Sequence, residues 1–314
     1  YQASGMRIPV VLCLVNRALA APLNVNGDHS DLYLTRDSGW ISLDAFNPQQ
    51  AYDITLMAFK ISEHPAVRLP VISNQDGFMT SHTAQNVTPL PDEVACKFVG
   101  DYLQVNALLN FDKPVTHGVQ TEQDWHFEHK AKQHAALMGS KKVILEVFKE
   151  FKELTGREYK LVETYNMENS EIAVVCLGTT FETAMVAIEE LKAEGINAGV
   201  VAPRVFRPFP LEEMAEALQG VKAIACMDRS APGGTVGTLF NEISGALINT
   251  PNRPLVSNLI YGLGGRDMTV AGLKDIYRTL HKEAQEGKLS GKIQRFVGVR
   301  GPELSFYDAQ GVQK

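Results

Sequence analysis

The sequence lacks the closely spaced cysteines that iron–sulfur clusters need. Its 314 residues contain four cysteines and no C-x-x-C pair, whereas such clusters are held by neighbouring thiolates. We therefore expect that this chain binds no iron–sulfur cluster by itself. Isolated cysteines, most of them inside apolar runs, are typical of small buried side chains in a reducing cytoplasm. We expect this of Cys13, Cys96, Cys176 and Cys226.

Long hydrophobic runs and an excess of basic charge are also missing. No apolar run reaches the roughly 18 residues that a membrane-spanning helix requires, and the longest, residues 8–15, is interrupted at Pro9. The formal net charge is −6, whereas a nucleic-acid-binding protein needs a basic face. We expect a soluble cytoplasmic protein, without membrane or nucleic-acid partners, whose 45% hydrophobic content suffices for one large or two ordinary cores.

Several catalytic motifs are absent as well. The chain has no Walker loop and no H-E-x-x-H zinc motif. The glycine run at residues 262–265 lacks the G-x-G-x-x-G spacing and follows the last predicted strand, so we do not expect a Rossmann dinucleotide site. Two interpretations of this run stay open: another backbone approaches closely there, or a phosphate does.

What is present indicates an α/β fold. Within residues 1–115, segments 8–15, 40–43 and 69–74 are predicted to be buried strands, and Pro48 is a suitable first residue for a helix between the last two. Strand, helix and strand in this order predict a parallel sheet covered by helices.

Residues 116–165 have a different character. A charged helix is predicted there from about residue 127 to 154, and we interpret this stretch as a helical linker that packs against another element. Regular alternation follows in residues 166–290 and predicts a second doubly wound domain, with a C-terminal tail over 291–314. The strands of this second domain are predicted at residues 172–177, 198–202, 221–227 and 255–260, and a capping box at 179–182 begins its first helix.

The loop after the first predicted strand carries the most chemistry. Ligands bind beyond the carboxyl ends of strands in such sheets, and Arg17 there can hold a carboxylate through two parallel hydrogen bonds. The run Gly27-Asp28-His29-Ser30-Asp31 adds two carboxylates and an imidazole. A surface loop stabilised by Asx turns is the alternative. A metal site at His29 is a further one, although no second histidine lies at ligand spacing.

Four arginines fall in loops of the second predicted domain. They could form a shared anion-binding rim, for example for coenzyme A, or they could make interface salt bridges. The sequence favours neither interpretation for Arg204, Arg207, Arg229 and Arg266.

Short motifs, each weak alone, extend over nearly the whole chain. They are S-G-M-R-I-P from Ser4, N-R-A-L from Asn16, G-D-H-S-D from Gly27, D-G-F-M-T-S-H from Asp76, P-R-V-F-R-P-F-P from Pro203 and G-L-G-G-R-D from Gly262. Together they strongly resemble the alpha subunit of pyruvate and related 2-oxoacid:ferredoxin oxidoreductases. The resemblance implies a thiamine-diphosphate-binding domain of the pyrimidine type, followed by a domain like the C-terminal one of transketolase.

The resemblance also implies an activity that this chain has only in a complex. Enzymes of the family cleave a 2-oxoacid on thiamine diphosphate, transfer the acyl group to coenzyme A and reduce ferredoxin, in anaerobic metabolism. The implied partners are a beta subunit that shares the thiamine cofactor, with gamma and ferredoxin-like delta subunits. Mg2+ and [4Fe-4S] clusters would belong to these partners, in agreement with the missing C-x-x-C.

Residue roles follow from the same resemblance. Arg17 matches the arginine that the family places at the substrate carboxylate, and a guanidinium there would fix the keto carbon near the cofactor. We expect no metal ligand in this chain. The residues expected to line the site are Asn16, Asn26, Gly27, Asp28 and His29.

The beginning of the sequence departs from the family pattern. A glutamate and a P-I-T-P threonine precede the S-G-M-R stretch in the family and do not occur here. We therefore expect that the N-terminal segment is missing from this sequence or forms a separate chain. Three alternatives to a pyruvate-cleaving subunit stay open: a branched-chain 2-oxoacid substrate, the equivalent subunit of a 2-oxoacid dehydrogenase or transketolase, and a non-catalytic assembly subunit.

Overall fold

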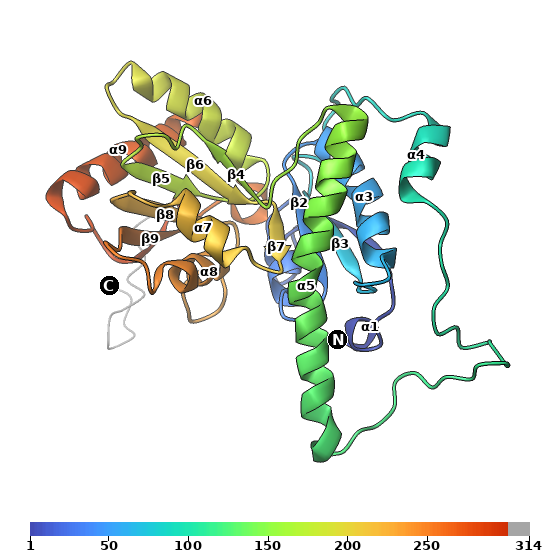
Figure 1. Ribbon diagram of the computed structural model, residues 1–314. Coiled ribbons are helices and arrows are strands. Elements are labelled where there is room, and N and C mark those ends of the chain that lie inside the picture. The colour runs from blue at the N-terminus through green and yellow to red at the C-terminus, as the bar shows by residue number, and fades with distance from the viewer. Residues whose placement is uncertain (301–314) are drawn as a thin grey trace.

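Two β-sheets organise the computed structural model, which describes residues 1–300 (Figure 1). The first sheet has the strand order β1-β3-β2-β7. Its strands β1 (Val11–Asn16), β2 (Ile41–Ala45) and β3 (Val71–Asp76) are parallel, and the short β7 (Val205–Arg207) pairs antiparallel with β2. The α/β class is confirmed, because successive parallel strands are joined through helices.

Helix α3 (Pro48–Glu63) packs on β1, β2 and β3 of the first sheet. Asn47 caps it, since its side chain accepts the N–H of Gln50 at 2.9 Å. The long α5 (Gln123–Thr155) and α4 (Asp92–Val99) pack on α3 in turn. The short α1 (Gln2–Gly5) touches α5, and α2 (Ser30–Thr35) lies beside β1.

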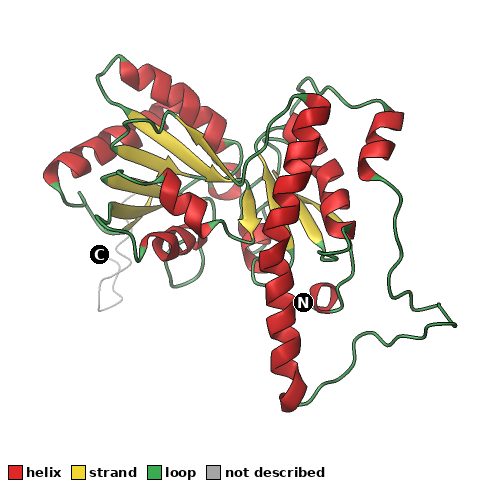
Figure 2. Cartoon of the chain, in the orientation of Figure 1, coloured by secondary structure: helices red, strands yellow, loops and turns green. Residues whose placement is uncertain are grey.

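The second sheet has six strands in the order β10-β9-β8-β5-β6-β4. Helices α6 (Thr180–Lys192) and α9 (Val270–Glu286) pack together on one face, and α7 (Leu211–Ala217) packs with α8 (Thr238–Leu247) on the other (Figure 2). This is the doubly wound arrangement. The strands are β4 (Val162–Tyr165), β5 (Ile172–Val175), β6 (Ala198–Pro203), β8 (Ala223–Asp228), β9 (Leu255–Ile260) and β10 (Gln294–Phe296), and the short helix η1 (Leu263–Gly265) follows β9.

The structure departs from the sequence expectations at several short elements. β4 lies within the stretch expected to be a helical linker, and β10 lies within the stretch expected to be a tail, of which residues 301–314 are outside the described part. Both strands complete the edges of the second sheet. The capping box is wrong, because the Thr179 side chain makes no cap hydrogen bond to its helix. Its hydroxyl instead bonds to Asp76, a residue of the first sheet.

The expectation of buried cysteines holds for two of the four. Cys176 and Cys226 are buried in the core of the second sheet, and burial raises the pKa of both thiols. Cys13 and Cys96 are exposed, because β1 is an edge strand and Cys96 lies on the outer side of α4.

Within residues 1–300, the helices are all too short or too polar to cross a membrane.

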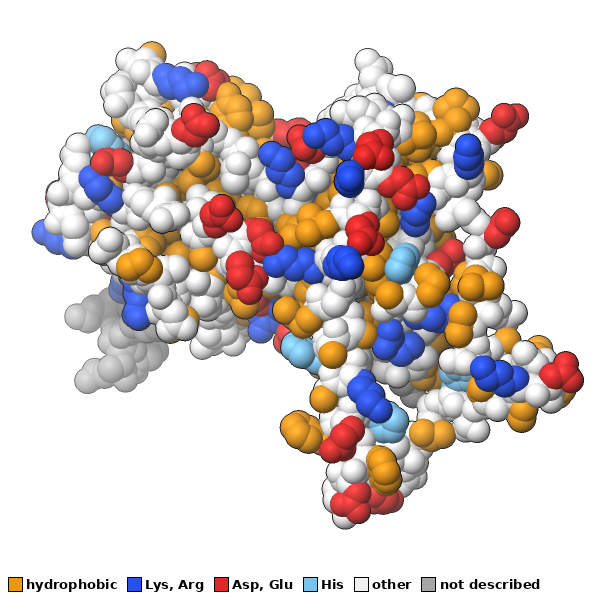
Figure 3. All heavy atoms as spheres, in the orientation of Figure 1, with side chains coloured by type: hydrophobic (Ala, Val, Ile, Leu, Met, Phe, Trp, Pro, Cys, Tyr) orange, Lys and Arg blue, Asp and Glu red, His pale blue; other side chains and the backbone are white. Residues whose placement is uncertain are grey.

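A long irregular segment, residues 100–122, joins α4 to α5 and extends away from both sheets (Figures 1 and 2). We call it the arm. Hydrophobic side chains are visible along it in the space-filling view (Figure 3). The most exposed of its large hydrophobic residues are Leu103 (65%), Leu108 (65%), Leu109 (78%) and Phe111 (88%).

Candidate functional site

Arg17 follows β1 directly, at the carboxyl end of the parallel sheet. Its backbone N–H donates to a carboxylate oxygen of Asp31 at 3.0 Å, and its side chain is exposed. Among residues 1–300 the guanidinium has no hydrogen-bond or ion-pair partner. The fold therefore holds the backbone of Arg17 and leaves its charged group available for a ligand.

The neighbouring Asn16 is fully buried, and its Oδ1 accepts the N–H of Leu32 at 3.2 Å. The Nδ2 of Asn16 is buried too and has no partner in the described chain. A buried donor without a partner is costly in a finished fold. The end of β1 thus carries two unused donors, a buried one at Asn16 and an exposed one at Arg17.

Backbone segments pack very closely around these two residues. The N–H of Gly77 donates to the carbonyl oxygen of Asn16 at 2.8 Å, and the N–H of Ala18 donates to Asn26 at 3.0 Å. A Cβ on Gly77 would overlap the Asn16 carbonyl, and a Cβ on Gly27 would overlap the Gly77 carbonyl. Both positions therefore require glycine, and the backbone of Asn26 and Gly27 packs against Ala18 and Gly77, while their expected role in lining the site stays a prediction.

Asp28 and His29 lie deeper, between the two domains. His29 is fully buried, its Nε2 lies 2.8 Å from Oδ1 of Asp76, and its backbone N–H donates to the carbonyl oxygen of Arg229 at 2.7 Å. Asp28 accepts the N–H of Ser30 at 2.9 Å and that of Gly264 at 3.4 Å. Their expected role in lining the site stays a prediction, while their contacts join the Arg17 loop to the second domain.

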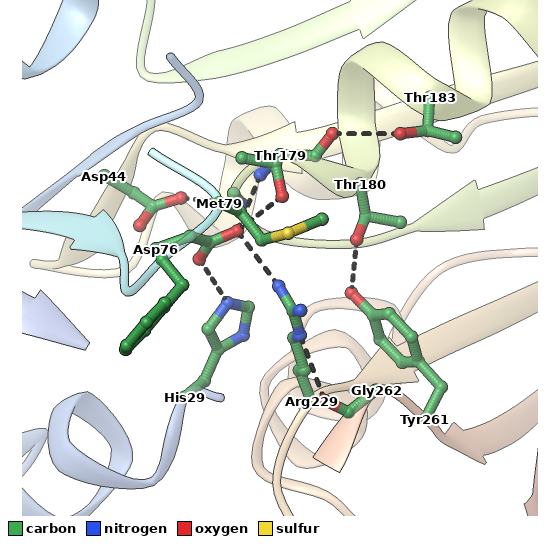
Figure 4. Close-up of polar contacts among 12 residues, drawn as sticks. His29, Asp44, Asp76, Met79, Thr179, Thr180, Thr183, Arg229, Tyr261 and Gly262 are labelled. Carbon is green, nitrogen blue, oxygen red and sulfur yellow. Dashed lines mark hydrogen bonds and ion pairs between the residues drawn. The ribbon is translucent and has the colours of Figure 1, made fainter. Parts of the chain in front are cut away.

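Asp76, the last residue of β3, is the centre of this junction (Figure 4). Its Oδ2 accepts the N–H and the hydroxyl of Thr179, at 2.9 and 2.7 Å, and lies 3.3 Å from Nη1 of Arg229. Burial opposes ionisation of Asp76, but His29 and Arg229, with the Thr179 hydroxyl, outweigh it and hold the pKa well below its usual range. A carboxylate therefore joins β3 to the loops after β5 and β8.

Two further buried carboxyls border the junction. Asp44 accepts a hydrogen bond from Asn74 and another from the N–H of Gly178, at 2.9 Å. Asp228 accepts the N–H of Leu239 at 2.7 Å, at the start of α8. Burial raises the pKa of each to about 6. The carboxyl ends of the two sheets thus meet across a polar layer that is mostly buried.

Sequence reasoning did not identify Asp44, Asp76 or Thr179 as members of this layer. A signal was present, because Asp76 and Asp228 each end a buried strand, where functional groups gather in α/β sheets. Their partners lie far away in sequence, so the pattern alone could not pair them.

The glycine run at residues 262–265 packs against the Arg17 loop. The Asn24 amide donates to the carbonyl oxygen of Gly264 at 3.2 Å, and a Cβ on Gly265 would overlap the side chain of Asn26. Of the two open interpretations, the close approach of another segment is the one that the structure shows.

The four arginines do not form one rim. Arg204 is 2% exposed, lies 3.7 Å from the ring centre of Phe46, and donates to the carbonyl oxygen of Asp44 at 2.6 Å. Arg229 is buried against Asp76. Arg207 pairs with Glu242 at 2.6 Å, and Arg266 donates to a backbone carbonyl at 2.5 Å. A shared coenzyme A rim made of all four is therefore excluded by burial.

A metal site at His29 finds no support in the geometry, because His29, Asp28 and Asp31 each bond to a different partner. Within residues 1–300 there is no group of three or more histidine, cysteine or acidic side chains that could hold a metal ion.

Family models match both halves of the chain. Residues 1–149 match the thiamine-diphosphate-binding domain of pyruvate flavodoxin/ferredoxin oxidoreductases, and residues 170–273 match core domain II of pyruvate:ferredoxin oxidoreductase. The chain is 41% identical to the pyruvate synthase subunit PorA of Thermotoga maritima over 300 residues, which cover 96% of this chain and 76% of that one.

Other relatives are named for a different substrate. The ketoisovalerate oxidoreductase subunit VorA of Pyrococcus horikoshii is 38% identical over 293 residues, covering 93% of this chain and 74% of that one. A solved 2-oxoglutarate:ferredoxin oxidoreductase from Magnetococcus marinus shares the fold, with a TM-score of 0.61 at 16% identity, over 90% of this chain and 50% of that one. These matches and the motifs along its sequence show that the chain belongs to the 2-oxoacid:ferredoxin oxidoreductase family. Within this family it is similar to the PorA and VorA subunits.

Proposed function

We propose that this chain holds the carboxylate of a 2-oxoacid in a pyruvate:ferredoxin oxidoreductase complex. The complex converts pyruvate and coenzyme A to acetyl-CoA and carbon dioxide, with electrons passing to ferredoxin, or runs the reverse synthesis. The observation that carries the proposal is the exposed guanidinium of Arg17, which has no partner within residues 1–300 and follows β1 directly, at the carboxyl end of the parallel sheet, where ligands bind in such folds. A carboxylate has the acceptor oxygens that the guanidinium donors need.

The residues at this site fit a carboxylate substrate beside thiamine diphosphate. When bound, thiamine diphosphate supplies the electron sink that allows the bond between the carboxylate and the keto carbon to break. Arg17 binds and orients the carboxylate, while Asn16, Gly27 and Gly77 hold the backbone around it. We assign the Mg2+ and the [4Fe-4S] clusters to partner subunits.

Exposed apolar surface supports partner subunits of the beta, gamma and delta types. The arm exposes Leu109 and Phe111, and edge strand β1 exposes Leu12 (44%) and Val15 (39%). Parallel strands are normally covered on both faces, and apolar patches mark protein interfaces. The relatives are named as subunits. All four cysteines are unpaired, which fits a reducing compartment such as the cytoplasm.

Viologen dye reduction by the purified complex tests the proposal, with pyruvate or ketoisovalerate and with or without coenzyme A. We expect pyruvate and coenzyme A to support reduction, and Arg17→Ala to lower kcat/KM by at least about a hundredfold. Arg17→Lys should retain part of the activity, because it keeps the charge and loses the two-pronged geometry. Arg253→Ala, at another exposed arginine, is the control.

The outcomes separate the alternatives. Reduction with ketoisovalerate and not with pyruvate would identify the second candidate substrate, which the similarity to VorA favours. Full activity of Arg17→Ala would leave this chain as an assembly subunit. An intact complex without any 2-oxoacid-dependent reduction would overturn the proposed function.

A further inference from the structure

We propose that Thr179 of the second domain is a positioning residue for Arg17, acting through Asp76. The inference rests on the proposed role of Arg17 and assigns a part of substrate binding to a residue outside the thiamine-type domain. Thr179 precedes α6 and is half-buried, and Figure 4 shows its hydroxyl directed at Asp76.

The first connection runs from Thr179 along β3. Thr179 donates both its N–H and its hydroxyl to one oxygen of Asp76, at 2.9 and 2.7 Å. The next residue, Gly77, donates its N–H to the carbonyl oxygen of Asn16, at 2.8 Å, and has no room for a Cβ against it. Because Asn16 precedes Arg17, a shift of Asp76 moves the backbone from which Arg17 extends.

The second connection reaches Arg17 from the other side of its loop. The other oxygen of Asp76 lies 2.8 Å from Nε2 of His29. Two residues later in the chain, the carboxylate of Asp31 accepts the N–H of Arg17 at 3.0 Å. Asp76 therefore fixes both the strand that leads into Arg17 and the loop that bonds to it.

Thr179 and His29 hold different oxygens of the Asp76 carboxylate: Thr179 donates to Oδ2, and His29 contacts Oδ1. Arg229 also lies 3.3 Å from Oδ2, a longer contact than either bond from Thr179. Without the hydroxyl of Thr179, the carboxylate loses the shorter of its two bonds from this residue. Asp76 is then held less firmly, both beside Gly77 in the backbone and at its contact with His29. Side chains that hold a substrate need such second contacts to keep their geometry.

Hydrogen exchange measured by mass spectrometry on the assembled complex tests the structural connection without any assay of activity. In Thr179→Val we expect peptides within residues 16–31 to exchange about tenfold faster, which is the loss of one hydrogen bond to a charged group. Thr179→Ser keeps the hydroxyl and should restore wild-type exchange. Thr183→Val is the matched control: Thr183 lies in the helix that Thr179 precedes, and its hydroxyl donates to the carbonyl oxygen of Thr179 at 3.4 Å and not to Asp76.

Kinetics test the positioning. Thr179→Val should raise KM for the 2-oxoacid about tenfold and leave KM for coenzyme A unchanged, whereas a general loss of structure would affect both. In an Arg17→Ala background the same substitution should have no further effect, because its action passes through Arg17.

Two results would overturn the inference. One is exchange in residues 16–31 that stays at the wild-type rate in Thr179→Val. The other is an equal effect of Thr179→Val on KM with and without Arg17. A wild-type complex that reduces no dye with any 2-oxoacid overturns the proposed function instead, and the exchange experiment still decides whether Thr179 holds the Arg17 loop.

Discussion

Asp53 in α3 and Arg157, just after α5, form a two-pronged ion pair in which Nε and Nη2 lie 2.7 and 2.9 Å from the carboxylate oxygens. The hydroxyl of Tyr159 donates to the same carboxylate at 2.5 Å. Asp53 is fully buried, whereas Arg157 is 26% exposed. This cluster attaches the end of the long helix to the helix that covers the first sheet.

Removing the charge of Asp53 should therefore destabilise the chain. We expect Asp53→Asn to lower the free energy of unfolding by about 2–3 kcal/mol, because it removes the charge that pairs with Arg157 and replaces one of the two acceptor oxygens with an NH2 donor. Urea unfolding followed by circular dichroism measures this. Glu150→Gln is the control, since its ion pair with Lys60 also joins α5 to α3 but is more exposed, and we expect it to cost less than about 1 kcal/mol. Equal costs in the two variants would contradict the explanation.

The buried carboxyls predict that stability falls as the pH rises. Asp44 and Asp228 have pKa values of about 6 in the fold, against 3.8 for an unperturbed aspartate. The folded state thus binds more protons than the unfolded state between these values. Their stabilising contribution is complete below pH 4 and is lost as the pH rises through 6, with about 1 kcal/mol per group lost between pH 5 and 7.

Unfolding at pH 5 and pH 7 checks this, with Asp44→Asn as the variant that lacks one of the two groups. Between pH 5 and pH 7, the free energy of unfolding should fall by less in the variant than in the wild type, whichever of the two proteins is more stable overall. Asp76 acts in the opposite direction, because its pKa is lowered, but it does so only at more acidic pH. A pH dependence that is the same in both proteins would show that Asp44 does not change its protonation between pH 5 and pH 7.

Gly178 should not tolerate a side chain. It has a φ of +64°, and a Cβ there would overlap the carboxylate of Asp76. We expect Gly178→Ala to cost about 3 kcal/mol or more in unfolding free energy, from backbone strain and overlap together. The matched control is Gly287→Ala, which has a φ of +67° and nothing within 4 Å, so that strain alone should cost about 1 kcal/mol. Similar costs would mean that Asp76 moves aside freely.

The arm should contribute to assembly and not to the stability of the isolated chain. We expect the double variant Leu109→Ser, Phe111→Ser to unfold within about 0.5 kcal/mol of the wild type, since both side chains are exposed. Its affinity for the co-purified partner subunits should fall at least about tenfold, measured by biolayer interferometry. Gln104→Ser, another exposed position of the arm, is the control. Unchanged affinity would remove the arm from the interface.

The sequence was most informative where a single segment determines its own structure. The apolar segment at 172–177 contains β5, because a strand buried on both faces is normally apolar throughout. The segment at 255–260 coincides with β9 although it includes the buried polar residues Ser257 and Asn258. The position of Arg17 just after a strand was also predicted, but the burial expected for residues 8–15 is wrong, because β1 is an edge strand that exposes Leu12 and Val15.

Features that depend on distant partners could not be predicted in this way. β7 is three residues long and is defined by its pairing with β2. The buried position of His29 depends on Asp76 and Arg229, one from each domain. An Asp-Gly-Phe turn at residue 76 has no local sign that its carboxylate is the centre of a domain junction.

β7 has a consequence for the order of events on the ribosome. This strand closes the outer edge of β2, yet it is synthesised only after β4, β5 and β6 of the other sheet. Until residues 205–207 emerge, the nascent first domain exposes an unpaired strand edge, the feature that invites pairing with other chains. The two halves therefore cannot mature one after the other, and a fragment cut before residue 205 would lack part of its own sheet.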